Sequence, residues 1–243
     1  YFYRVWNLER IFMFSNKILE IFSNLEKINP FIISDNHFNH QNVLNFEPSR
    51  LKQMKKDGFD DHEKWMISKW NEVVKPDDIV IHLGDFAFKH INQLENKLNG
   101  IKILILGNHD RKGNQTYQNI FDYIIRGSQV VFNNKLYIAE ANDLLFSSII
   151  ASYEDKTLLF SHYPATLTEI DLYESFGKKD RYEKICNRIY SLIEIADENC
   201  ININIHGRTH SRNIVDNKQF FSFINSSIEN IDFKPQRLSE LLR

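Results

Sequence analysis

Histidine, carboxylate and amide side chains recur in short polar stretches, each directly after an apolar segment with the pattern of a buried strand. The clearest example is residues 107–110 (GNHD), which end the apolar run 101–106. Glycine and asparagine favour turns, so this stretch alone is compatible with a surface loop. Further strand-like segments end in the same way, at Asp35/His37, Asp85, His162 and His206/His210. This repetition predicts a shared polar site.

The donor types in these stretches suit divalent metal ions. Imidazole nitrogen, carboxylate oxygen and amide oxygen together bind Mn, Fe, Co, Ni or Zn, and the absence of cysteine ligands argues against a structural zinc site. Open α/β sheets bind ligands at the carboxyl ends of their strands, so residues far apart in the sequence can converge there. The pattern therefore predicts a metal centre, and this geometry favours two ions.

The elements that must position these residues alternate along the chain, which predicts an α/β fold. Helices are expected at residues 15–29, 49–74 with a break near Gly58, 89–98, 114–121, 181–196 and 239–243. Strands are expected at residues 31–33, 79–83, 101–106, 129–132, 136–139, 145–150, 157–160, 201–205 and 220–224.

The chain is expected to divide at residue 30. Residues 1–30 are predicted to be an N-terminal extension with one amphipathic helix, which ends at Pro30 and whose apolar face is Ile18, Ile21, Phe22, Leu25 and Ile28. Residues 1–14 show no clear period and are not placed. Residues 31–243 are expected to form one domain.

Composition excludes several classes of protein. With 42% hydrophobic residues, only 8 glycines and 5 prolines, the chain is globular. A net charge of −2 gives no global attraction to nucleic acid or to anionic lipid. Charged residues interrupt every N-terminal apolar run, and the two cysteines lack metal-site spacing. We therefore expect a soluble, cytoplasmic protein that is not bound to a membrane; no feature of the sequence specifies an oligomeric state.

In order and rough spacing, five motifs resemble those of the calcineurin-like metallophosphoesterases, in particular small bacterial and phage members. They are Asp35-Asn36-His37, Gly84-Asp85, Gly107-Asn108-His109-Asp110, Ser161-His162 and Gly207-Arg208-Thr209-His210. The resemblance runs from about residue 31 to the C-terminus and includes the tail 225–242 (NSSIENIDFKPQRLSELL). It implies a four-layer α/β sandwich, in which two mixed β-sheets are flanked by helices.

The resemblance also implies a role for each residue of the site. Asp35, His37 and His210 would hold one metal ion, Asp85 would bridge to a second, and Asn108 and His162 would complete the second site. His109 would lie beside the phosphate as a charge stabiliser or acid, and Asp110 would orient the His109 ring.

The implied activity is hydrolysis of a phosphate ester by a metal-bound hydroxide, with two divalent ions as cofactors. Mn is the first choice of metal, and Fe, Ni, Co and Zn are the alternatives. A phosphodiester or nucleotide-like substrate is expected first, and a phosphomonoester or phosphoprotein second.

Arg208 departs from the family pattern, which has a histidine ligand of the second metal at this position. A guanidinium is always protonated and offers no lone pair, so the second site loses one protein ligand. Water can complete a weaker site, His206 can shift in, or the second metal can be absent with Arg208 on the phosphate. We favour a weak second site with Arg208 near the substrate. A salt bridge to Asp110 or another acid is the purely structural alternative.

Arg208 also keeps a second class of function open, a non-catalytic binding module with the same fold. The remaining histidines are interpreted as structural residues: His40, His62, His82 and His90. His82 lies within a strand and is expected to be a hydrogen-bonded core residue. His206 adjoins the site without an assigned role.

Overall fold

The computed structural model describes residues 16–40, 42–110, 115–125, 128–132, 135–139, 147–166, 179–210 and 221–243. The first of its two sheets has the strand order β11-β1-β2-β3-β4. The strands β1 (Phe31–Ile33), β2 (Ile79–His82), β3 (Ile101–Ile105) and β4 (Tyr123–Ile125) are parallel, and β11 (Gln236–Arg237) pairs antiparallel with β1. The four parallel strands therefore all end at one edge of the sheet.

The second sheet has the strand order β10-β9-β8-β7-β5-β6. Its strands are β5 (Ser128–Phe132), β6 (Lys135–Ala139), β7 (Ser148–Tyr153), β8 (Lys156–Ser161), β9 (Ile203–His206) and β10 (Ser222–Asn225). β8, β9 and β10 are parallel, whereas β7 is antiparallel to β8. The predicted hairpin is confirmed as the antiparallel pair of β5 and β6, although its turn residues 133–134 lie outside the described part.

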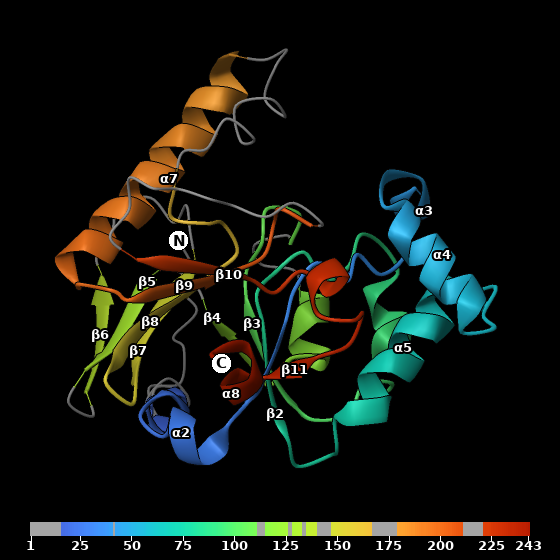
Figure 1. Cartoon of the computed structure of the whole chain (residues 1–243), viewed down its shortest axis with the longest axis horizontal. Helices are drawn as coiled ribbons and strands as arrows, with labels where there is room; N and C mark the ends of the chain where they lie inside the picture. The colour runs from blue at the N-terminus through green and yellow to red at the C-terminus, as the bar shows by residue number, and fades with distance from the viewer. Residues whose placement is uncertain are drawn as a thin grey trace, which may run out of the picture.

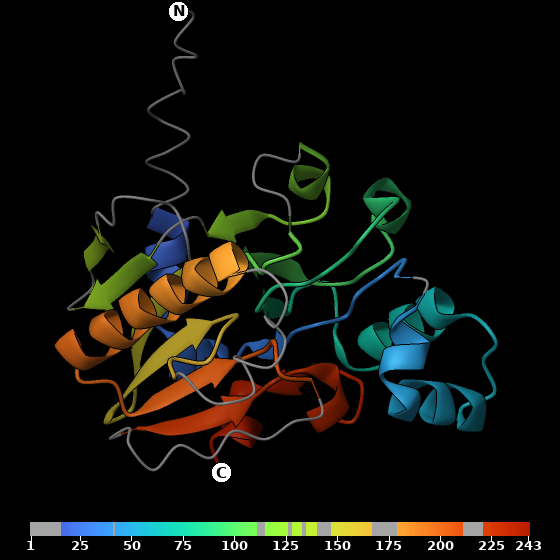
Figure 2. The same cartoon turned by 90° about the horizontal axis from the view of Figure 1, so that it is seen from above.

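Both sheets turn one apolar face toward a shared core. Ile81 of β2 and Ile103 of β3 belong to the same buried cluster as Leu158 and Phe160 of β8. Successive strand residues point to opposite faces, so each sheet also has an outer apolar face that needs a cover. Helices provide that cover on both sides (Figure 1, Figure 2).

The outer face of the first sheet, with Leu104, packs against Trp65 and Trp70 of α5 (His62–Val73). The outer face of the second sheet, with Leu159, packs against Ile189 of α7 (Lys179–Glu198). The order of layers is thus helix, sheet, sheet, helix. The expected sandwich of two mixed sheets flanked by helices is confirmed.

The predicted helical stretch at 49–74 is confirmed as two helices, and a short helix that was not predicted precedes them. The structure contains α3 (Val43–Phe46), α4 (Pro48–Lys56) and α5, with the predicted break at Gly58, whose φ is +82°. The predicted helices at 89–98 and 114–121 are wrong in type, since both are short 3₁₀ segments, η1 (Ile91–Leu94) and η2 (Gln115–Asn119). His90 and Asn96 adopt left-handed φ values of 49° and 58°, which limits η1 to a single short segment.

The N-terminal helix expected at 15–29 is divided into a helical stretch at 16–22 and α2 (Leu25–Ile28). Its predicted apolar face is confirmed for Ile18, Ile21, Phe22 and Leu25, which are buried in the core between the sheets. The C-terminal segment contains η3 (Ile228–Asn230) and α8 (Leu238–Leu241). Among the helices of the described ranges, none is long and apolar enough to span a membrane.

Candidate metal centre

The candidate ligands lie where the parallel strands end, in the loops that follow β1, β2, β3, β8 and β9 (Figure 1). Several residues of these loops adopt a left-handed backbone, which costs non-glycine residues free energy: Asp35 (φ 59°), His37 (51°), Asp85 (54°), Arg208 (71°) and His210 (50°). Strained conformations persist only where the surrounding structure fixes them, and they cluster at functional sites. The strain therefore marks the same loops as the sequence motifs.

Asp35, His37 and His210 converge on one point. Asp35 Oδ1 lies 3.7 Å from His37 Nε2 and 3.9 Å from His210 Nε2. Both separations are shorter than twice a metal–ligand bond of about 2.1 Å, so one ion can contact all three atoms. Asp35 Oδ1 and both ring nitrogens of His37 are buried without a hydrogen-bond partner among the described residues. These buried atoms without hydrogen-bond partners are suitable ligands for a metal ion.

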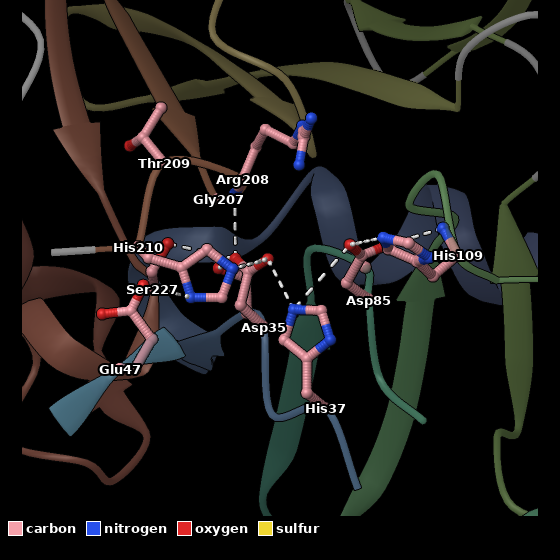
Figure 3. Close-up of polar contacts among 12 residues, drawn as sticks. Asp35, His37, Glu47, Asp85, His109, Gly207, Arg208, Thr209, His210 and Ser227 are labelled. Atoms are coloured by element: carbon pink, nitrogen blue, oxygen red, sulfur yellow. Dashed lines mark hydrogen bonds and ion pairs between the residues drawn. The ribbon is translucent and has the colours of Figure 1, made fainter. Parts of the chain in front are cut away.

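The second group of possible ligands is Asp35, Asp85 and His162, beside Asn108. Asp85 Oδ2 lies 3.5 Å from His162 Nε2 and 3.9 Å from His37 Nε2, so this oxygen faces both groups (Figure 3). His162 Nε2 also lies 2.9 Å from Asn108 Oδ1. The three residues that the resemblance implies for bridging and second-site binding, Asp85, Asn108 and His162, are thus brought within one cluster.

The environment of His162 Nε2 calls for a positive charge. His162 Nδ1 donates to the carbonyl of Leu83 at 2.8 Å, which leaves Nε2 facing the oxygens of Asp85 and Asn108. Burial opposes protonation, but the Asp85 carboxylate outweighs it and raises the pKa of His162 to about 9. The oxygens around Nε2 therefore favour a positive charge at this position.

The two carboxylate oxygens of Asp35 differ: Oδ2 accepts three hydrogen bonds, whereas Oδ1 has no hydrogen-bond partner among the described residues. Its Oδ2 accepts hydrogen bonds from Ser34 Oγ at 2.7 Å, Ser227 Oγ at 3.0 Å and the Arg208 N–H at 2.9 Å. Burial opposes ionisation, yet the neighbouring imidazoles of His37, His162 and His210 hold the pKa of Asp35 well below its usual range. A Cβ on Gly207 would lie 2.5 Å from Asp35 Oδ2, which requires glycine there.

Asp110 does not orient the His109 ring as expected. Its carboxylate accepts four hydrogen bonds from neighbouring loops: from the N–H groups of Asp85, Phe86 and Gly107 and from the Tyr117 hydroxyl. An acceptor surrounded by backbone donors fixes the loops after β2 and β3 relative to each other. The resemblance implies that Asp110 orients the His109 ring, whereas in the structure these four donors occupy its carboxylate.

His109 lies at the edge of the cluster, with Nε2 3.8 Å from Asp85 Oδ2 and its ring 4.5 Å from that of Phe88. Burial lowers the pKa of His109, and the Asp85 carboxylate partly opposes this effect. Together with His37, His210 and Arg208, it lines a cavity of about 580 Å³. His109 is thus placed between the possible metal ligands and the space open to a substrate.

Arg208 also lines this cavity, and its side chain extends away from Asp35 (Figure 3). The guanidinium carbon lies 5.3 Å from the centre of the Tyr163 ring. His206, in contrast, is fully buried. Its Nδ1 donates to the Gly207 carbonyl at 2.8 Å, and its ring contacts that of Phe223. In the ligand groups found among the described residues, His206 is absent.

His82 is a hydrogen-bonded core residue, as its place within a strand predicted. Its Nδ1 accepts from the Gly84 N–H at 3.1 Å, so Nε2 carries the proton and donates to Asn36 Oδ1 at 2.7 Å. Asn36 lies between Asp35 and His37 in the sequence. The neutral ring therefore supports the turn that carries the first group of possible ligands.

This arrangement predicts a loss of stability in acid. Burial lowers the pKa of His82 from 6.5 to about 3, so between these values the unfolded chain binds a proton that the folded protein does not. The free energy of unfolding then falls by about 1.4 kcal/mol per pH unit as the pH decreases below 6.5. The variant His82→Gln keeps a donor but cannot titrate, so urea unfolding between pH 7 and pH 4 should show a shallower decline. Identical slopes in the two proteins would contradict this origin.

A comparison with known families identifies the class of protein. The family model for calcineurin-like phosphoesterases matches residues 30–211, and the chain therefore belongs to this family. An uncharacterised protein of Methanocaldococcus jannaschii, MJ1445, is 37% identical over 91 residues, which are 34% of this chain and 47% of that protein. The chain thus spans about half the length of this curated relative.

Among solved structures, AQ665 from Aquifex aeolicus, described as a protein of unknown function, shares 25% identity with a TM-score of 0.60. The alignment covers 87% of this chain and 96% of that chain. This similarity extends over nearly the whole of both chains, so the architecture described above is shared with AQ665.

Proposed function

We propose that this protein hydrolyses phosphate esters with divalent metal ions held where β1, β2, β3, β8 and β9 end. The observation that carries the proposal is the position of Asp85 Oδ2, within 3.9 Å of His37 Nε2, His162 Nε2 and His109 Nε2. One carboxylate oxygen thus faces both groups of possible ligands and the proposed acid. Membership of the calcineurin-like phosphoesterases supports the same reaction class.

The residues divide the work between metal binding and substrate binding. Asp35, His37 and His210 would hold one ion, and Asp85, Asn108 and His162 the second, with Asp85 between them. Divalent ions bound there supply Lewis acidity, which neutralises charge on the phosphoryl oxygens and activates water. His109 lies beside Asp85 and lines the cavity, so it can donate a proton to the leaving oxygen. Arg208 can pair with a phosphate oxygen from the cavity wall.

The walls of the cavity favour a phosphodiester with an aromatic group, such as a nucleotide. Phe46 lines the cavity, is 68% exposed and has its ring centre 5.9 Å from that of His40, so an apolar ring is presented to the cavity. Phe88 and His40 stack beside it, with ring centres 4.1 Å apart and planes 6° from parallel. A planar group can extend this row while its phosphate reaches the metal ligands. A phosphomonoester or phosphoprotein is the second choice, because it would leave Phe46 without a role.

The reaction class is tested with chelator-treated protein and bis-p-nitrophenyl phosphate. We expect negligible hydrolysis without metal and a restored rate with Mn, measured beside Fe, Co, Ni and Zn. We also expect the diester to be hydrolysed with a higher kcat/KM than p-nitrophenyl phosphate. If no metal restores a rate, the enzymatic proposal is wrong; if the monoester is preferred, only the choice of substrate is wrong.

Phe46→Ala should raise KM for bis-p-nitrophenyl phosphate about tenfold with little change in kcat, because base–aromatic stacking contributes about 1–3 kcal/mol. The reason is that Phe46 contacts the substrate far from the reacting atoms, so it contributes equally to ground and transition states. The matched control is Leu51→Ala, which shortens another exposed apolar side chain of the neighbouring α4. Equal KM values for Phe46→Ala and the wild type would remove the aromatic subsite.

Arg208→His should strengthen the second metal site by about 10-fold or more, because it adds an imidazole ligand where the guanidinium has no lone pair. Isothermal titration with Mn is expected to show one tight and one weaker ion in the wild type and two tight ions in the variant. The idea of a weakened site fails if both proteins bind two ions with equal affinity.

A non-catalytic binding module is the second candidate function, and Arg208 is the observation that favours it. Such a module would bind a phosphate-containing ligand in the same cavity without turnover. It predicts that phosphate binds while bis-p-nitrophenyl phosphate hydrolysis stays at the level of an inactive variant with every metal.

A further inference from the structure

We infer that Arg50 and Glu229 form a buried ion pair that positions His210 and the turn after β1 for metal binding. The inference rests on the proposed function, in which His210 Nε2 and Asp35 Oδ1 hold the same ion. Arg50 lies on α4 and Glu229 in η3, 179 positions apart in sequence. Only the tertiary fold brings Arg50 and Glu229 together at the site.

Arg50 is fully buried, which is rare for arginine and requires partners for its donors. Its Nε donates to Glu229 Oε1 at 2.5 Å. One terminal nitrogen donates to the Asn36 carbonyl at 3.0 Å and the other to the Asp35 carbonyl at 2.7 Å. The guanidinium therefore ties η3 to the backbone of the turn that carries the first group of possible ligands.

This turn needs external support. Asp35 and His37 both have left-handed φ values, of 59° and 51°, so the backbone between them is held in a conformation that L-residues disfavour. The two carbonyl groups bound by Arg50 belong to Asp35 and Asn36, within this strained stretch. Loss of the guanidinium would release the carbonyls and allow Asp35 Oδ1 and His37 Nε2 to separate.

Glu229 acts at the other end of the ligand group. Its Oε1 lies 3.2 Å from His210 Nδ1, and only 1% of its side chain is exposed. A histidine that donates Nδ1–H to a carboxylate keeps its Nε2 lone pair for a metal and cannot flip. His210 Nε2 accordingly faces Asp35 Oδ1, at 3.9 Å. Glu229 thus fixes both the tautomer and the orientation of the ring.

The same residues do not form a further metal site. Glu47, His210 and Glu229 could by their spacing hold an ion of their own. However, an Arg50 terminal nitrogen lies 3.4 Å from His210 Nδ1, and Arg50 Nε bonds Glu229. The guanidinium already supplies the positive charge of this cluster and would repel a second cation. The contacts of Arg50 and Glu229 therefore fit a role in positioning His210.

The test measures Mn binding directly, by isothermal titration of chelator-treated full-length protein. Glu229→Gln keeps the size and an acceptor but loses the charge, and we expect about 10-fold weaker binding at the tighter site. Glu229→Ala removes both and should weaken binding by about 100-fold. The visible spectrum of the Co(II)-loaded protein should change in both variants, because the ligand geometry around His210 changes. Arg50→Lys, which keeps a charge but cannot hold Glu229 and both carbonyls, should also weaken binding.

The matched control is Glu72→Gln, which makes the same chemical change in an exposed ion pair with Lys234. It should bind Mn like the wild type. Wild-type affinity in folded Glu229→Gln and Arg50→Lys would overturn the inference, even if Glu229→Ala fails to fold. Asp35→Asn separates this result from failure of the metal centre itself: if Asp35→Asn also binds Mn like the wild type, the proposed centre is wrong, and the positioning role fails with it.

Discussion

Asp85→Asn is expected to lower kcat/KM for bis-p-nitrophenyl phosphate by about 10³-fold, which corresponds to about 4 kcal/mol of transition-state stabilisation. Asparagine retains an oxygen that can accept from the His109 N–H, as Asp85 Oδ1 does at 2.9 Å. It replaces the charged Oδ2, which faces His37 and His162. The variant should therefore fold but lose the negative charge shared by the two groups of possible ligands.

Steady-state kinetics at saturating Mn measure this effect, and circular dichroism checks the fold. The matched control is Asp60→Asn, because Asp60 is fully exposed and pairs with Lys55. It should retain wild-type kinetics. A loss of less than tenfold in Asp85→Asn would mean that the carboxylate does not bridge two ions during hydrolysis.

His109→Gln should reduce kcat by about 10²-fold or more for an ester with a poor leaving group, since general acid catalysis contributes about 10²–10⁴-fold. The reason is geometric: His109 Nε2 lies 3.8 Å from Asp85 Oδ2, and His109 lines the cavity beside the possible metal ligands His37 and His210. p-Nitrophenolate leaves without much help from an acid. The loss should therefore be much smaller with bis-p-nitrophenyl phosphate than with a dialkyl phosphate diester, in which either leaving group is an alcohol.

His90→Gln provides the control, since His90 is exposed and lies outside the site. Burial lowers the pKa of His109, so its contribution should also decline as the pH rises and the protonated fraction falls. An equal loss for both leaving groups at every pH would assign His109 to phosphate binding and not to proton donation.

The sequence was most informative where the relevant contacts are local. Short apolar runs such as residues 79–82 and 101–105 form parallel strands because both of their faces are buried, and each run is followed at once by the residues that the sheet edge collects. The positions of Asp85 and His162 follow from this rule. The break near Gly58 was equally readable, because glycine permits its φ of +82°.

Features of the site that depend on tertiary contacts could not be predicted from the sequence. Arg50 lies among the lysines of a charged helix, and nothing in that pattern distinguishes a buried arginine from an exposed one. Its burial arises only when Glu229, near the C-terminus, packs against it. The role of Asp110 was misjudged for the same reason, because its partners are backbone groups of a neighbouring loop. The left-handed backbone of the ligand loops is only weakly indicated by residue type, since aspartate and histidine are enriched in this conformation but do not require it.

Anomalous diffraction from Mn-soaked crystals with phosphate is the most direct test of the proposed centre. We predict a strong Mn peak in contact with Asp35 Oδ1, His37 Nε2 and His210 Nε2. A second, weaker peak is predicted beside Asp85 Oδ2, His162 Nε2 and Asn108 Oδ1, with phosphate between the ions and Arg208. Absence of Mn from both positions in crystals that bind Mn elsewhere would contradict the account.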